Sequence, residues 1–173
     1  GVIVDTWMAS PHLRAVVRHP VQSRTLPGVG GGTLVDVAPW GRDDVAYEIT
    51  PLVGGGWLDV DAMERDPDGV TVRGTVRSLP DRDVPEGDAA SVRWSLSPDA
   101  PVVTLDGADG LWLHPLSPAV RLGPALVIDG VVVVTDTGAI EDLGGALRMD
   151  DVHRIAVAPL GEADWLDHPT VRL

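Results

Sequence analysis

The chain has 173 residues and a formal net charge of −13 at pH 7. It contains no cysteine, lysine or asparagine, so it has no disulfide, thiolate nucleophile, Schiff-base or P-loop lysine, or N-glycosylation site. The acidic balance argues against nucleic acid and anionic membranes as partners, since both attract basic patches.

Residue usage indicates a GC-rich genome, because Ala, Gly, Pro, Arg, Val and Asp replace residues with AT-rich codons. The length predicts a single β-rich domain over 1–173, with the Pro- and Asp-rich loop 78–90 as the place for a sub-boundary if the chain divides. The longest apolar run, Ala125–Val134, is interrupted by Asp129 and falls short of a membrane span. Gly1–Ser10 has no basic region or long apolar core, so we expect no signal peptide there.

The first part of the chain predicts strands over Val2–Trp7 and Val45–Ile49. Between them, Ser10-Pro11 has the N-cap and N1 residues of a two-turn helix that would end before Pro20. The same stretch also alternates apolar and polar residues, so a strand competes with the helix.

The centre of the chain carries the clearest period-2 pattern. In Val70–Arg77, three valines point to one side and Thr and Arg residues point to the other. Ser91–Leu96 repeats the pattern with Val92, Trp94 and Leu96 inward. We therefore expect two antiparallel strands, each with one buried and one wet face.

Two hairpins are predicted further along. The first runs from Val102 to Leu113, and the second from Leu126 to Val134 around Asp129-Gly130, a type I′ turn sequence. Another strand is expected over Val152–Ala158. The consecutive valines 131–134 leave no polar face, which predicts a strand covered on both sides. The expected fold is all-β: an antiparallel sandwich or partly closed barrel with little helix.

Three tryptophans are candidate contacts for a ligand or partner. Trp40 lies in a Pro-Trp-Gly loop, and Trp57 follows three glycines. Trp112 alternates with two leucines, so it faces outward if the leucines face the core. Exposed aromatic side chains at such places bind sugars or proteins, although each could instead fill a gap in a core without phenylalanine.

No catalytic, cofactor or metal site is predicted. The histidines show no paired metal-ligand spacing, and no G-x-S-x-G motif is present. Asp59 and Asp61 would share a strand face as a carboxylate pair, but with 26 acidic residues such pairs are expected by chance. The segments 66–69 and 106–110 resemble calcium loops incompletely, and Asp-Gly turns explain both.

The leading hypothesis is a non-enzymatic structural or interaction subunit of a larger assembly, with protein partners or self-association. Its suggested context is a bacteriophage tail or another virion from a high-GC bacterial system. One alternative is a carbohydrate-binding β-domain, which clustered outward tryptophans would favour. The other is a small hydrolase or isomerase, which a barrel pocket holding a histidine and a perturbed acid would favour. Large apolar surfaces on several sides would favour assembly.

Overall fold

The computed structural model describes residues 5–20, 32–42, 45–79, 83–84, 87–114, 120–122, 125–128, 131–135, 140–144, 146–152 and 155–159. Every regular element in these ranges is a β-strand, which confirms the all-β prediction. The same ranges contain no helix capable of crossing a membrane.

The strands, in chain order, are β1 (Thr6–Ala9), β2 (Leu13–Val17), β3 (Leu34–Pro39), β4 (Val45–Val53), β5 (Gly56–Asp66), β6 (Gly69–Arg77), β7 (Ala89–Leu96), β8 (Val103–Asp106), β9 (Gly110–His114), β10 (Val120–Leu122), β11 (Ala125–Ile128), β12 (Val131–Thr135), β13 (Glu141–Asp142), β14 (Leu147–Met149) and β15 (Ile155–Pro159).

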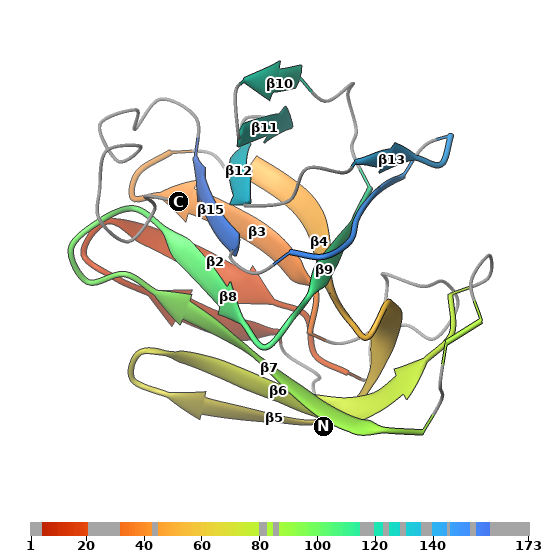
Figure 1. The fold of residues 1–173 in the computed structure, drawn as a ribbon. Helices are drawn as coiled ribbons and strands as arrows, with labels where there is room; N and C mark the ends of the chain where they lie inside the picture. The colour runs from red at the N-terminus through yellow and green to blue at the C-terminus, as the bar shows by residue number, and fades with distance from the viewer. Residues whose placement is uncertain are drawn as a thin grey trace.

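All described pairings are antiparallel and form one branched sheet. Its main path runs β1-β2-β3-β4-β5-β6-β7-β8-β15-β12-β11-β10 and does not close into a barrel. The branch leaves at β4, which also pairs with β9, and continues through β14 to β13. In Figure 1, β5, β6 and β7 lie below β2 and β3, giving a sandwich-like arrangement.

One hydrophobic cluster fills the space between the parts of the sheet. It combines Leu13 and Ala15 of β2 and Ile49 of β4 with Val72 of β6 and Trp94 of β7. The period-2 predictions for β6 and β7 are therefore confirmed. The three valines of β6 and the first two predicted residues of β7 are buried, and Leu96 is partly buried.

The opposite face of β5, β6 and β7 is polar, as the alternation predicts. Arg73 reaches Glu64 across the strands, and Arg77 Nε lies 3.4 Å from Asp59 Oδ2. These partners are about half exposed, so each pair contributes little to stability. Each pair nevertheless gives an oppositely charged neighbour to an arginine that the alternation places on the face away from the core.

The hairpin predicted over Val102–Leu113 is wrong. β8 pairs with β7 and β15, whereas β9 pairs with β4 and β14. Between them, the Asp109 amide donates to the Leu52 carbonyl at 3.0 Å, which turns the chain toward β4. The Gly-rich turn thus connects strands of different parts of the sheet. Turn residues alone do not specify which strands will pair.

The helix beginning at Ser10-Pro11 is also wrong, and the competing strand forms as β2. The Ser10 amide donates to the Leu13 carbonyl at 2.8 Å, and Ser10 Oγ accepts the His12 and Leu13 amides at 3.2 Å. These bonds close a turn that pairs β1 with β2. Burial of alternate residues in β2 then favours a strand over a helix.

The second hairpin prediction is confirmed, since Ile128 pairs with Val131 and Leu126 with Val133. Its turn residues lie outside the described ranges. β12 is flanked by β11 and β15, and Val133 is buried. The strand predicted over Val2–Trp7 is described only from Thr6, and the strand predicted over Val152–Ala158 begins at Ile155.

The segment 78–90, named as a sub-boundary, is described only in part. The strands on its two sides, β6 and β7, pair along seven residue positions from Gly69↔Ser95 to Thr75↔Ala89. The domain count itself stays a prediction.

Candidate functional site

The exposed large hydrophobic side chains of the described residues are Trp7 and Trp40, with 47% and 49% of their surfaces accessible. They are in contact. Their ring centroids lie 6.3 Å apart and the ring planes meet at 88°, an edge-to-face pair. The Trp7–Trp40 patch is therefore a single apolar surface formed from residues 33 positions apart in sequence.

Local hydrogen bonds hold this patch in place. Trp40 follows the end of β3 and its Nε1 donates to the Ser10 carbonyl at 2.7 Å. The Arg42 amide donates to the Pro39 carbonyl at 3.3 Å, closing the turn that presents Trp40. Trp7 stands on β1, directly across from Val16 of β2. Because the Trp40 indole nitrogen is already bonded, its exposed ring surface is what remains available to a ligand.

Trp7 was not among the tryptophans predicted from sequence. Trp7 and Asp5 are two residues apart, so their side chains point to the same face of the strand predicted over 2–7. The charge of Asp5 indicates that this face is the polar one. Contact with Trp40 required the β1–β2–β3 arrangement, which no local pattern provides. Of the three predicted tryptophans, Trp40 thus lies against Trp7, a ring that the sequence analysis did not select.

Trp57 lies on β5, half-buried, and its Nε1 donates to the Ser78 carbonyl at 3.2 Å. It is cross-strand from Arg77 of β6 and from Leu52 of β4. It makes no described ring contact with the Trp7–Trp40 patch. Its indole serves to join β5 to the segment that follows β6.

Trp112 lies on β9 with Leu111 and Leu113 buried on the opposite face, as the alternation predicts. Its Nε1 donates to His114 Nε2 at 2.7 Å. Cross-strand neighbours on this face are Thr50, opposite Trp112, and Glu48, opposite His114. Glu48 forms an ion pair with Arg18 at 2.8 Å.

The face around Trp112 does not assemble a nucleophile, a base and an acid. Thr50 Oγ1 is 3.0 Å from Thr33 Oγ1, His114 accepts from an indole, and the carboxylate of Glu48 is taken by an arginine. The first of these contacts joins Thr33 to β4, the second lies within β9, and the third joins Arg18 to β4. The backbone amide of His19 donates to Asp5 Oδ1 at 2.9 Å, and positions 153 and 168 lie outside the described residues.

The carboxylate pair predicted at Asp59 and Asp61 is interrupted by a bulge. β5 and β6 change register between Val60 and Ala62, leaving Asp61 as the extra residue, and Asp59 pairs with Arg77. The simple alternation used to place both acids on one face therefore does not hold here.

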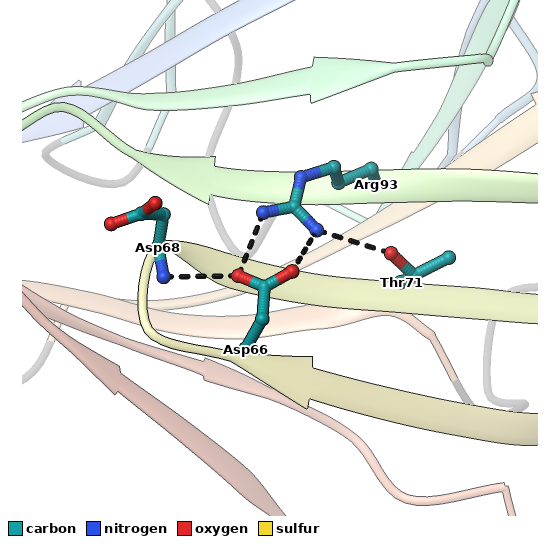
Figure 2. A network of polar contacts seen from close by, with 4 residues as sticks. All are labelled: Asp66, Asp68, Thr71 and Arg93. Atoms are coloured by element: carbon teal, nitrogen blue, oxygen red, sulfur yellow. Dashed lines mark hydrogen bonds and ion pairs between the residues drawn. The ribbon is translucent and has the colours of Figure 1, made fainter.

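The first calcium-like segment is occupied by protein groups. Figure 2 shows Arg93 reaching from β7 to Asp66, with both guanidinium nitrogens on the two carboxylate oxygens. Asp66 Oδ1 also accepts the Asp68 amide at 3.0 Å, and Arg93 donates to Thr71 Oγ1 at 3.2 Å. The hydrogen bonds from Arg93 and the Asp68 backbone lower the pKa of Asp66 to about 2. The Asp66 carboxylate therefore stabilises the turn before β6 and forms an ion pair with Arg93.

The second segment borders a shallow pocket of about 210 Å³, lined by Gly54, Gly55, Asp109, Asp150 and Asp151. Asp109 Oδ2 accepts the Gly54 amide at 2.9 Å, and Asp150 lies 3.5 Å from Arg148 Nε. No histidine lines this pocket, and no three His, Cys, Asp or Glu side chains of the described residues converge as metal ligands. The pocket therefore lacks the combination that the enzyme alternative requires.

The chain matches no protein-family model, no curated protein and no solved structure.

Proposed function

We propose that this chain is a non-enzymatic interaction domain that contacts a partner within a larger assembly through the Trp7–Trp40 patch. The observation that carries the proposal is the contact between Trp7 and Trp40, which are the exposed large hydrophobic side chains among the described residues. Tryptophan is enriched among residues that dominate binding energy at protein interfaces. A fixed ring loses little conformational entropy on binding.

The size of the patch sets a requirement on the partner. Covering the exposed halves of two indoles removes roughly 200 Å² from water and contributes roughly 5 kcal/mol. Association costs about 4–15 kcal/mol in lost translation and rotation, so the patch alone does not give a stable complex. The partner must also engage neighbouring backbone or polar groups.

We propose that the assembly is a bacteriophage tail or another virion of a high-GC bacterial system. Support for this setting comes from residue usage alone. The exposed large hydrophobic side chains of the described residues lie in one patch, which fits a peripheral or end-on subunit better than one enclosed on many sides.

The proposal is tested by photo-crosslinking in cells that produce the chain. A photoreactive residue at Ala9, exposed on β1 beside the patch, is compared with the same residue at Thr71 on the charged face. We expect discrete protein adducts from Ala9 that disappear when Trp40→Ala is added. Equal adducts from both positions, or adducts indifferent to Trp40→Ala, would overturn the proposal.

A carbohydrate-binding domain is the second candidate, because clustered outward tryptophans are the arrangement that favours it. The exposed faces of Trp7 and Trp40 could stack on the apolar face of a sugar ring, and the exposed side chains of His12 and Arg42 lie on the turns next to the two rings. Affinity electrophoresis through gels containing neutral or acidic polysaccharides tests this candidate. Retardation of the native chain, abolished by Trp40→Ala, would support it over the protein partner.

A further inference from the structure

The described sheet has three terminal strands, and they differ in charge. β1 and β10 end the main path, and β13 ends the branch. β13 consists of Glu141 and Asp142, and β10 contains Arg121. β1 reads Thr-Trp-Met-Ala and pairs among the described residues only with β2. Edge strands are commonly protected from pairing by charge, proline or a bulge, and the four residues of β1 contain none of these.

We propose that two copies of this chain join through β1, antiparallel and edge to edge, with Trp7 of each copy directly opposite Trp7 of the other. This inference rests on the proposed interaction function and names the partner as a second copy. A two-fold axis makes the interface self-complementary, because the same strand supplies both sides. The N–H and C=O groups of β1 that point away from β2 would add the directional bonds that the aromatic patch alone lacks.

Strand parity limits the register of this pairing. Residues directly opposite in an antiparallel pair point to the same face, so exposed Trp7 and Ala9 must face exposed residues and buried Met8 must not face them. A two-fold axis can therefore pass through position 7 or position 8, but not between them.

An aromatic cross-strand pair favours position 7. The Ser10 amide bonds Leu13 of β2, so by alternation the backbone groups of Trp7 and Ala9 point away from β2. An axis at position 8 would place each Trp7 opposite Ala9. An axis at position 7 pairs Thr6 with Met8 and Asp5 with Ala9, and it brings the two Trp7 rings together.

This register also places two Trp40 rings beside the joined strands, because each Trp40 contacts its own Trp7. Four indoles then form one continuous cluster across the two-fold axis. Along the strands the charged side chain, Asp5, faces Ala9, so no like charges are opposed. Each copy nevertheless carries −13, and this long-range repulsion must be screened for the strands to approach.

The first experiment is sedimentation equilibrium of the purified chain across protein and salt concentrations. We expect a monomer–dimer equilibrium whose dissociation constant falls at least tenfold between 0.02 and 0.5 M salt, about one and a half decades in ionic strength. Trp7→Ala should raise the dissociation constant at least tenfold, whereas Arg73→Ala on the exposed face of β6 should leave it unchanged. A native chain that stays monomeric at high salt and millimolar concentration overturns the self-pairing.

The second experiment fixes the register, using the absence of native cysteine. Asp5→Cys and Ala9→Cys are oxidised separately and as an equimolar mixture. Position 5 faces position 9 in the proposed register, so the mixture should form a disulfide-linked heterodimer while each variant alone remains largely uncrosslinked. Homodimers from each variant alone, or no crosslink in the mixture, would overturn the register.

If Asp5→Cys is destabilised by loss of the His19 contact, Ala9→Arg and Ala9→Glu replace it. Opposite Asp5, Ala9→Arg should tighten the dimer and Ala9→Glu should weaken it, and the reverse order overturns the register.

The self-pairing and the proposed function can fail separately. The chain could prove monomeric and still give Trp40-dependent adducts from Ala9 to another protein. That result would overturn the second copy as the partner, and the proposed interaction function would still hold. Loss of those adducts to any protein, including the chain itself, would overturn both.

Discussion

The indole nitrogen of Trp94 lies 2.8 Å from the carbonyl oxygen of Gly32 and donates a hydrogen bond to it. Trp94 is fully buried on β7, and Gly32 lies two residues before the start of β3. Gly32 adopts a φ of +85°, which glycine tolerates without strain. This one bond therefore joins the two facing parts of the sheet through the largest side chain of the core.

Replacing Trp94 should be among the most damaging single substitutions. Trp94→Ala should lower the free energy of unfolding by about 3–5 kcal/mol, because it leaves a large cavity and an unpaired Gly32 carbonyl. Trp94→Phe should cost less, since it keeps most of the ring volume and loses the hydrogen bond. Urea denaturation monitored by circular dichroism measures both. A loss below about 1 kcal/mol for Trp94→Ala would contradict burial of this side chain.

Gly74 of β6 should not tolerate a side chain. A Cβ at this position would overlap the Asp59 carbonyl oxygen of β5, beside the bulge at Asp61. Gly74→Ala should therefore destabilise the fold by about 1–3 kcal/mol through overpacking against backbone. Thr75→Ala, one position along the same strand, provides the control, and equal melting temperatures for the two variants would contradict the close approach.

The Asp66–Arg93 ion pair should give the protein an acid-dependent loss of stability. The pKa of Asp66 is lowered from 3.8 to about 2 in the folded state, so the unfolded chain binds more protons between these values. The stabilisation is complete above pH 4 and is lost as the pH falls toward 2. Asp66→Asn should show a flatter stability curve over this window in urea titrations at stepped pH. Parallel curves for the two proteins would contradict the lowered pKa.

Metal removal should not change the fold. Asp66 already bonds Arg93 and the Asp68 amide, and Asp109 bonds the Gly54 amide, so neither segment presents a free carboxylate cluster. We expect the same melting temperature with a strong chelator and with millimolar calcium, measured by scanning calorimetry. A rise of several degrees with calcium would show that these carboxylates can reorganise around a cation.

Trp7 and Trp40 should be energetically coupled in the monomer as well. An edge-to-face aromatic pair contributes about 0.5–1.5 kcal/mol beyond the area that it buries. A double-mutant cycle of Trp7→Ala and Trp40→Ala, measured by urea unfolding at low salt, should return a coupling energy of this size. Strictly additive losses would indicate that the rings do not interact in solution.

Sequence patterns predicted the elements well where one face of a strand is buried. Val72 and Val92 follow their alternation because burying a valine on the wrong face would cost both core packing and polar solvation. The wet face with Arg73 and Arg77 follows for the same reason. The sequence also indicated that Trp40 is exposed, from its position in a Pro-Trp-Gly loop, and half of its surface is accessible; its role as a contact residue stays a prediction.

The failures arise from interactions between distant segments. The alternation that placed Asp61 beside Asp59 was broken by a bulge, and the turn after β8 led to a strand other than its expected partner. Pairing of Trp7 with Trp40 depends on β2 lying between their strands. No local pattern encodes these choices, because they depend on which strands bury each other's side chains.

The position of β15 has a consequence for synthesis on the ribosome. β15 is the last described strand in the chain, yet it lies between β8 and β12 and hydrogen-bonds to both. Until residues 155–159 leave the exit tunnel, these two strands have no described link to each other through the sheet. Nascent chains would therefore carry two partly assembled units with open inner edges, and ribosome stalling before residue 155 should make them dependent on chaperones.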